Sequence, residues 1–182
     1  MRRFSTVLAM TCLLGLLVAP VLAGVKLGDP QVGQVAPTFR LQDQSGHWLT
    51  PTDFRGRWLV LYFYPNDFTP GCTTEVCAFR DDVAKFRQAG ALVAGVSLDG
   101  VKSHAQLAAK YHVPFPLLSD GDRQVAIRYG VLTSAIGIHL AKRTTFLIDP
   151  NGKIAKIYRD VDPEKNSAQV LSDLTTLKKA SA

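Results

Sequence analysis

Residues 62–80 read YFYPNDFTPGCTTEVCAFR, and this stretch decides how the rest of the chain is interpreted. It completes an unbroken apolar run from Trp58 to Tyr64, which predicts a strand buried on both faces. Pro65 and the pair Pro70-Gly71 interrupt that run. Apolar residues then recur at helix-face spacing from Val76 onward, which predicts a helix directly after the strand.

Cys72 lies at the junction of this predicted strand and helix, in the first turn of the helix. The free backbone N–H groups and the positive end of the helix dipole favour an anion at that place. A thiolate is such an anion, and it is the nucleophilic form of cysteine. The pattern therefore predicts a reactive Cys72, with a second cysteine, Cys77, five residues further along the same helix.

The spacing Pro65-x-x-x-Thr69-x-x-Cys72 resembles the active-site signature of the peroxiredoxins. With Cys77 included, the stretch is similar to the peroxiredoxin Q (bacterioferritin comigratory protein) subfamily. The resemblance covers nearly all of the chain after the leader and is weakest over Leu132–Lys142. Other segments that carry it are Ser103-His104, Lys110-Tyr111, Phe115–Asp120 and Arg143–Asp149.

The resemblance implies a thiol peroxidase of the atypical two-cysteine kind. Cys72 would attack the peroxide and become a sulfenic acid, Cys77 would resolve it as an intramolecular disulfide, and a thioredoxin-like or other dithiol reductant would restore both thiols. Arg143 would be the cation that stabilises the thiolate and binds the peroxide oxygens. Thr69 would donate its hydroxyl to the thiolate or accept from the peroxide, and Pro65 would shield the sulfur from water.

Helix geometry places a condition on the disulfide. Residues five apart on an α-helix are rotated by about 140° and separated by about 7.5 Å along the axis. Their Cα atoms are then roughly 8 to 9 Å apart, beyond the limit of about 7 Å for a disulfide. A Cys72–Cys77 bond therefore requires the first turns of the helix to unwind.

The rest of the chain predicts an α/β fold with a central mixed sheet flanked by helices and an N-terminal hairpin. Strand–helix–strand order predicts parallel pairing, and the turn Asp149–Gly152 predicts an antiparallel hairpin. The resemblance implies a thioredoxin-like fold of the peroxiredoxin type. The other expected elements are a hairpin within residues 38–49, strands at Ala91–Ser97, Phe115–Leu118, Thr144–Ile148 and Ile154–Tyr158, and helices near Lys102–Tyr111, Asp122–Tyr129 and Pro163–Lys178.

Residues 1–23 predict a cleavable signal peptide, because a short cationic start precedes the apolar stretch Val7–Val18 and small residues end at Ala23. An uncleaved membrane anchor is the alternative, for which the apolar run is short. Cys12 lies in this leader. We expect residues 24–182 to form a single domain that is exported to the periplasm or an equivalent compartment, where disulfides are permitted.

Composition narrows the classes of function. An apolar fraction of 47% with 20% charged residues is typical of a globular protein with a core. The formal net charge of +6 falls to +4 without the two leader arginines, and no run of Lys or Arg is present, so we expect no nucleic acid partner. The four histidines lack metal-ligand spacing and no phosphate-binding glycine loop occurs, so we expect no metal and no organic cofactor. The resemblance favours a monomer, and we expect no membrane contact after leader cleavage.

Two other functions compete with the peroxidase. An exported thioredoxin-like disulfide oxidoreductase would have two residues between its cysteines, whereas four separate Cys72 from Cys77, and Thr69 and Arg143 would have no role. A non-catalytic binding module of the same fold would hold a static Cys72–Cys77 bridge, which the helix geometry opposes. Consumption of peroxide with a dithiol present distinguishes the peroxidase from the binding module.

Each site residue also has a plainer interpretation. Cys72 or Cys77 can be a small buried hydrophobe, and with a structural Cys77 an external thiol would resolve Cys72. Thr69 can be a turn residue, and Arg143 alone is an ordinary surface arginine. Glu75 can cap the helix or tune the site, and no catalytic role is predicted for it.

Overall fold

The computed structural model describes residues 28–135 and 137–180, so the predicted signal peptide and its boundary at Ala23 lie outside the described residues. The α-helices are α1 (Pro70–Gln88), α2 (Val101–Tyr111), α3 (Gln124–Arg128) and α4 (Asn166–Ala180), and a short 3-10 helix spans Pro51–Phe54. The strands are β1 (Leu41–Gln42), β2 (Trp48–Leu49), β3 (Trp58–Phe63), β4 (Ala91–Ser97), β5 (Leu117–Ser119), β6 (Leu132–Ala135), β7 (Ile138–Ala141), β8 (Thr144–Ile148) and β9 (Ile154–Arg159).

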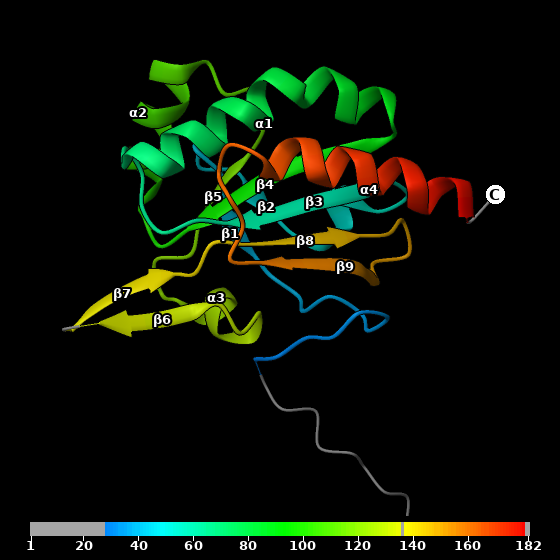
Figure 1. The fold of residues 1–182 in the computed structure, drawn as a ribbon. Helices are drawn as coiled ribbons and strands as arrows, with labels where there is room; N and C mark the ends of the chain where they lie inside the picture. The colour runs from blue at the N-terminus through cyan, green and yellow to red at the C-terminus, as the bar shows by residue number, and fades with distance from the viewer. Residues whose placement is uncertain (1–27, 136, 181–182) are drawn as a thin grey trace, which may run out of the picture.

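Seven strands form one mixed sheet in the order β2-β1-β5-β4-β3-β8-β9. The helices α1, α2 and α4 lie on one side of this sheet and α3 lies on the other (Figure 1). The strands β6 and β7 form a separate two-stranded sheet that projects from one end of the molecule (Figure 1). This arrangement confirms the predicted α/β class with a central mixed sheet flanked by helices.

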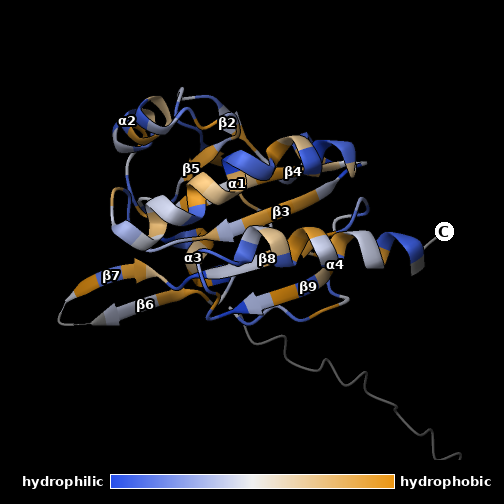
Figure 2. Ribbon diagram, turned by 45° about the horizontal axis from the view of Figure 1, so that its top comes forward, coloured by the Kyte–Doolittle hydropathy of each residue, from blue (hydrophilic) through white to orange (hydrophobic). Residues whose placement is uncertain are grey.

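The central strand β3 has core on both faces, as its continuous apolar sequence predicts. Leu59, Leu61 and Phe63 belong to the core on the α3 side, whereas Val60 and Tyr62 belong to the core under α1, α2 and α4. Figure 2 shows β3 and β4 mostly hydrophobic, while α1 and α4 alternate between hydrophobic and hydrophilic residues. The helices therefore bury one stripe on the sheet and expose the other.

The predicted strand pairings are confirmed. β3 and β4 pair in parallel across the α1 crossover, and β4 and β5 pair in parallel across α2. β8 and β9 form the predicted antiparallel hairpin, and β1 and β2 form the predicted N-terminal one. The antiparallel pairing of β8 with β3 places Thr144 opposite Phe63, so β8 begins where β3 ends.

Two features differ from the sequence-based expectation. Leu132–Lys142 holds the hairpin β6–β7, which no turn signal had predicted. The closing helix was predicted to open at Pro163, but α4 begins at Asn166. The carbonyl oxygen of Asp162 accepts from the backbone N–H groups of Lys165 (3.1 Å) and Asn166 (3.0 Å), so residues 162–165 form a turn before the helix.

None of the helices in the described part of the chain combines the length and the apolar character that crossing a membrane requires.

Candidate active site

Cys72 lies in the first turn of α1, where the sequence places it. Thr69 is the N-cap residue, and Pro70 occupies a first-turn position at which the lack of an N–H costs nothing. The first helical hydrogen bond runs from the N–H of Thr73 to the carbonyl of Thr69 at 2.9 Å. The N–H of Cys72 is therefore among the donors that have no partner within the helix, and these favour an anion. The side chain is nearly inaccessible, at 2% exposure.

Arg143 reaches this sulfur from a distant part of the chain. It directly precedes β8, and the register of β8 on β3 places it beside the end of β3, from which the chain leads into α1. Its Nη2 donates to Cys72 Sγ at 3.2 Å. The sequence-based expectation of a cation at the thiol therefore agrees with the geometry, and a positive charge in contact with sulfur stabilises a thiolate.

Glu75 holds the other side of the same guanidinium. Arg143 Nη1 donates to Glu75 Oε2, and the Glu75 side chain is fully buried. Burial raises the pKa of Glu75, while Arg143 and Asn166 act in the opposite direction. Burial alone lowers the pKa of Arg143, but the neighbouring Glu75 and Cys72 raise it overall. Glu75 does not cap α1, since Thr69 occupies the N-cap position; it holds the arginine that contacts the thiol.

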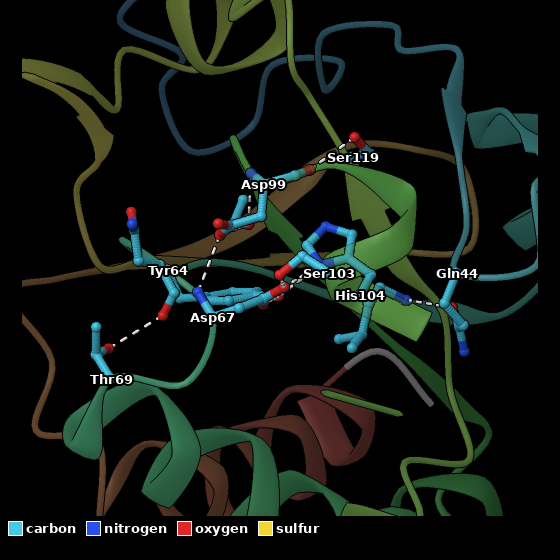
Figure 3. Close-up of polar contacts among 11 residues, drawn as sticks. Gln44, Tyr64, Asp67, Thr69, Asp99, Ser103, His104 and Ser119 are labelled. Carbon is cyan, nitrogen blue, oxygen red and sulfur yellow. Dashed lines mark hydrogen bonds and ion pairs between the residues drawn. The ribbon is translucent and has the colours of Figure 1, made fainter. Parts of the chain in front are cut away.

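Thr69 and Pro65 belong to the loop between β3 and α1. The hydroxyl of Thr69 donates to the carbonyl of Asn66 at 3.0 Å (Figure 3), so its single hydrogen is not directed at Cys72 in this structure. The lone pairs of that hydroxyl remain available as acceptors, and the expected acceptor role toward a peroxide stays a prediction. Pro65 is half-buried, and its shielding of the sulfur likewise stays a prediction.

A buried polar cluster around Asp67 anchors this loop, and no sequence pattern had predicted it. The carboxylate accepts from Tyr64 (hydroxyl, 2.8 Å), Ser103 (hydroxyl, 2.6 Å) and His104 (Nδ1, 2.9 Å), as Figure 3 shows. The N–H of Asp67 donates to Asp99 at 2.9 Å. Burial raises the pKa of Asp67, but the hydrogen bonds from His104, Ser103 and Tyr64 outweigh it and lower the pKa below its usual value. The Asp67 carboxylate thereby ties the loop before Cys72 to α2.

Cys77 lies on α1 with Cys72, and both carry free thiols. Its side chain is half-buried and packs against the core under α1, α2 and α4. Both cysteines lie on an intact helix, which holds them too far apart for a disulfide. The structure therefore represents the state before α1 unwinds.

Among the described residues, no group of three or more His, Cys, Asp or Glu side chains is placed to hold a metal ion. The observed contacts bring together a thiol, a helix N-terminus and an arginine held by a buried carboxylate.

Comparison with known proteins identifies the family. A model described as the AhpC/TSA family matches residues 32–157. The chain belongs to the AhpC/TSA family of peroxiredoxins. This peroxiredoxin is 43% identical over 151 residues to peroxiredoxin Q, chloroplastic, of Oryza sativa subsp. japonica, a match that covers 82% of this chain and 69% of the rice protein. It is 42% identical over 151 residues to the putative peroxiredoxin bcp of Coxiella burnetii, which covers 79% of this chain and 98% of that protein.

Solved structures agree with these relatives. The peroxidoxin BcpB of Mycobacterium tuberculosis superimposes with a TM-score of 0.76 at 33% identity and covers 81% of this peroxiredoxin and 97% of that chain. Peroxiredoxin Q of Xanthomonas campestris gives a TM-score of 0.72 at 38% identity, covering 76% and 90%. The predicted thioredoxin-like fold of the peroxiredoxin type and the resemblance to the peroxiredoxin Q subfamily are confirmed, and the family supports a peroxidase.

Proposed function

We propose that this peroxiredoxin is an exported antioxidant enzyme that reduces hydrogen peroxide and organic hydroperoxides through Cys72. Cys77 resolves the oxidised sulfur as an intramolecular disulfide, and a thioredoxin-like or other dithiol reductant restores both thiols. The observation that carries the proposal is the contact of Arg143 Nη2 with Cys72 Sγ at the start of α1.

In the first step, the Cys72 thiolate attacks one peroxide oxygen. A sulfur–oxygen bond forms, the oxygen–oxygen bond breaks, and the departing oxygen takes a proton to leave as water or an alcohol. Negative charge develops on that departing oxygen, and Arg143 supplies a fixed positive charge beside it. Glu75 keeps the guanidinium in place, so little reorganisation is needed when the charge moves.

In the second step, the Cys77 thiolate attacks the sulfur of the Cys72 sulfenic acid. The sulfur–sulfur bond forms, the sulfur–oxygen bond breaks, and the departing hydroxide takes up the proton that the Cys77 thiol had lost and leaves as water. This step requires α1 to unwind between the two cysteines, because the intact helix keeps them too far apart. A dithiol reductant then attacks the disulfide, the two protein thiols return, and the helix re-forms. The reductant is itself oxidised to a disulfide.

The predicted leader supports export, and we propose cleavage after Ala23 and a periplasmic location. Expression of the full chain in a bacterial host, followed by cell fractionation and N-terminal sequencing, tests this part. Mature protein that begins at Gly24 in the periplasmic fraction is the expected result. An intact leader on cytoplasmic protein would overturn the export proposal and leave the peroxidase proposal standing.

The peroxidase proposal is tested on reduced residues 24–182 treated with one equivalent of hydrogen peroxide. Mass spectrometry of the intact chain should show loss of two hydrogens, with a Cys72–Cys77 bond in the peptides and reversal by a dithiol. The Cys77→Ser variant should gain one oxygen at Cys72 without the bond, and Cys72→Ser should not react. If the wild type adds oxygen at Cys72 but forms no bond, Cys77 is structural. If it does not react, the binding-module alternative replaces the enzyme.

A further inference from the structure

Asn166, the first residue of α4, is fully buried and directs its side-chain amide at the active site. Its Nδ2 donates to Glu75 Oε1 at 2.8 Å and to Thr145 Oγ1 at 2.7 Å, so both amide hydrogens are used. Its Oδ1 is buried without a hydrogen-bond partner among the described residues. Because only the N–H groups of this buried amide have partners, the contacts with Glu75 and Thr145 fix its position.

A continuous chain of contacts leads from this amide to the nucleophile. One carboxylate oxygen of Glu75 accepts from Asn166 and the other accepts from Arg143, whose second terminal nitrogen contacts Cys72 Sγ. Two opposed partners fix the plane of the carboxylate, and that plane sets the direction of the guanidinium. The orientation of Arg143 at the sulfur therefore depends on a residue of the C-terminal helix.

Glu75 also lies between the two cysteines on α1. Any unwinding of residues 72–77 must withdraw its carboxylate from both Arg143 and Asn166. The Asn166–Glu75 hydrogen bond therefore belongs to the helical state and is lost in the unwound state. A hydrogen bond that forms only in the helical state stabilises that state relative to the unwound state.

We propose that Asn166 is a positioning residue with opposite effects on the two chemical steps, an inference that rests on the proposed peroxidase function. It holds Glu75, and through it Arg143, in the arrangement that promotes attack of Cys72 on the peroxide. By the same bond it opposes the unwinding that brings Cys77 to the sulfenic acid. The side chain thus sets how long the sulfenic acid persists before it is resolved.

Ser167 provides a matched control. It is the next residue of α4, it is buried, and its hydroxyl donates to Asp82 Oδ2 on α1 at 2.8 Å. Asp82 lies beyond Cys77, outside the segment that must unwind. Ser167→Ala therefore removes a comparable contact between α4 and α1 without touching Glu75.

The experiment measures both steps by rapid mixing of reduced residues 24–182 with hydrogen peroxide. Sulfenic acid formation at Cys72 and the later disulfide formation are followed separately in the wild type, Asn166→Ala and Ser167→Ala. We expect Asn166→Ala to slow the first step and to speed the second, each by about tenfold, which corresponds to one hydrogen bond to a charged group. Ser167→Ala should leave both rates within about twofold of the wild type.

Asn166→Leu replaces the amide with an apolar side chain of similar shape, so it removes both donors without leaving a cavity. Glu75 loses its second partner, and we expect this variant to shift both rates in the same directions as Asn166→Ala. The measurement is made on variants shown by thermal unfolding to be folded. Slowing of both steps, or equal changes in the Asn166 and Ser167 variants, would overturn the inference. A wild type that forms neither product would instead overturn the proposed function.

Discussion

Arg143 Nη2 lies 3.2 Å from Cys72 Sγ, although 71 residues separate the two in the chain. Strand register brings them together, because β8 pairs with β3 in the antiparallel direction and begins where β3 ends. Cys72 follows β3 and Arg143 precedes β8. The contact is therefore fixed by the most buried part of the sheet.

Replacing Arg143 by Lys tests the fork geometry of the guanidinium. A lysine ammonium is a point charge and cannot bridge Glu75 and Cys72 in the same way. We expect the rate of sulfenic acid formation to fall by about 10- to 100-fold, measured by stopped flow at a fixed pH. Lys142→Ala, which removes an exposed neighbouring cation, is the control and should react at the wild-type rate. Equal rates for Arg143→Lys and the wild type would show that charge alone is sufficient.

Two substitutions of Thr69 test whether its hydroxyl oxygen acts as a hydrogen-bond acceptor in catalysis. Its hydrogen is used by the carbonyl of Asn66, so the expected contribution to catalysis is the oxygen as acceptor from the peroxide. Thr69→Ser keeps that oxygen and should retain most of the rate of peroxide reduction. Thr69→Val removes it and should lose about tenfold, a typical cost of one hydrogen bond in a transition state. A fast valine variant would assign Thr69 to the turn alone.

Asp67→Asn tests the cluster that ties the active-site loop to α2. The carboxylate accepts from Tyr64, Ser103 and His104, and an amide presents donors to some of these groups. We expect a loss of about 2 to 4 kcal/mol in the free energy of unfolding of the reduced protein, measured in urea at pH 7. Asp43→Asn, in the turn of the β1–β2 hairpin where the carboxylate accepts from the backbone N–H groups of Ser45 and His47, serves as a control and should cost less.

The difference in unfolding free energy between the wild type and Asp67→Asn has a predicted dependence on pH. The folded state lowers the pKa of Asp67 below its ordinary value, so the ionised form stabilises the fold. That contribution is fully present above the unfolded pKa and is lost as the pH falls through the folded pKa. The stability difference between the wild type and Asp67→Asn should therefore be constant near neutrality and shrink below about pH 4. A difference that grows on acidification would contradict this sign.

Tyr62 in β3 and Tyr64 directly after it stack on each other, and removal of their hydroxyls should change the stability of the protein in opposite directions. Tyr62 is buried, and its hydroxyl has no hydrogen-bond partner in the described part of the chain, whereas the hydroxyl of Tyr64 donates to Asp67. We expect Tyr62→Phe to stabilise the reduced protein by about 1 kcal/mol and Tyr64→Phe to destabilise it by about 1 to 2 kcal/mol. Urea unfolding of both variants checks the prediction, and a destabilised Tyr62→Phe would contradict it.

Local sequence patterns predicted the strand and the helix on either side of the loop that leads to Cys72. The apolar run from Trp58 and the first turn of α1 depend on neighbouring residues, so periodicity and the Pro-Gly break were sufficient. The hairpin β6–β7 was missed because its sequence, LTSA followed by IHLA, has neither clear alternation nor a strong turn pair.

The partners of the arginine could not be predicted in the same way. Glu75 is 68 residues from Arg143, and Asn166 is 91 residues from Glu75. A carboxylate inside a helix and an asparagine at a helix start usually face solvent, and only the tertiary packing of α4 on α1 buries them together. Arg143 itself was identified by resemblance, since a single arginine carries no local signal.

Because sheet register fixes the Cys72–Arg143 contact, the length of the chain between β5 and β8 has little influence on it. The β6–β7 hairpin pairs only within itself in the described residues and projects away from the main sheet (Figure 1). Peptide inserted between Ala135 and Ile138 would extend into solvent and leave β3 and β8 in register. The hairpin is therefore a suitable place to attach an affinity tag or a fluorescent reporter without changing the Cys72–Arg143 contact.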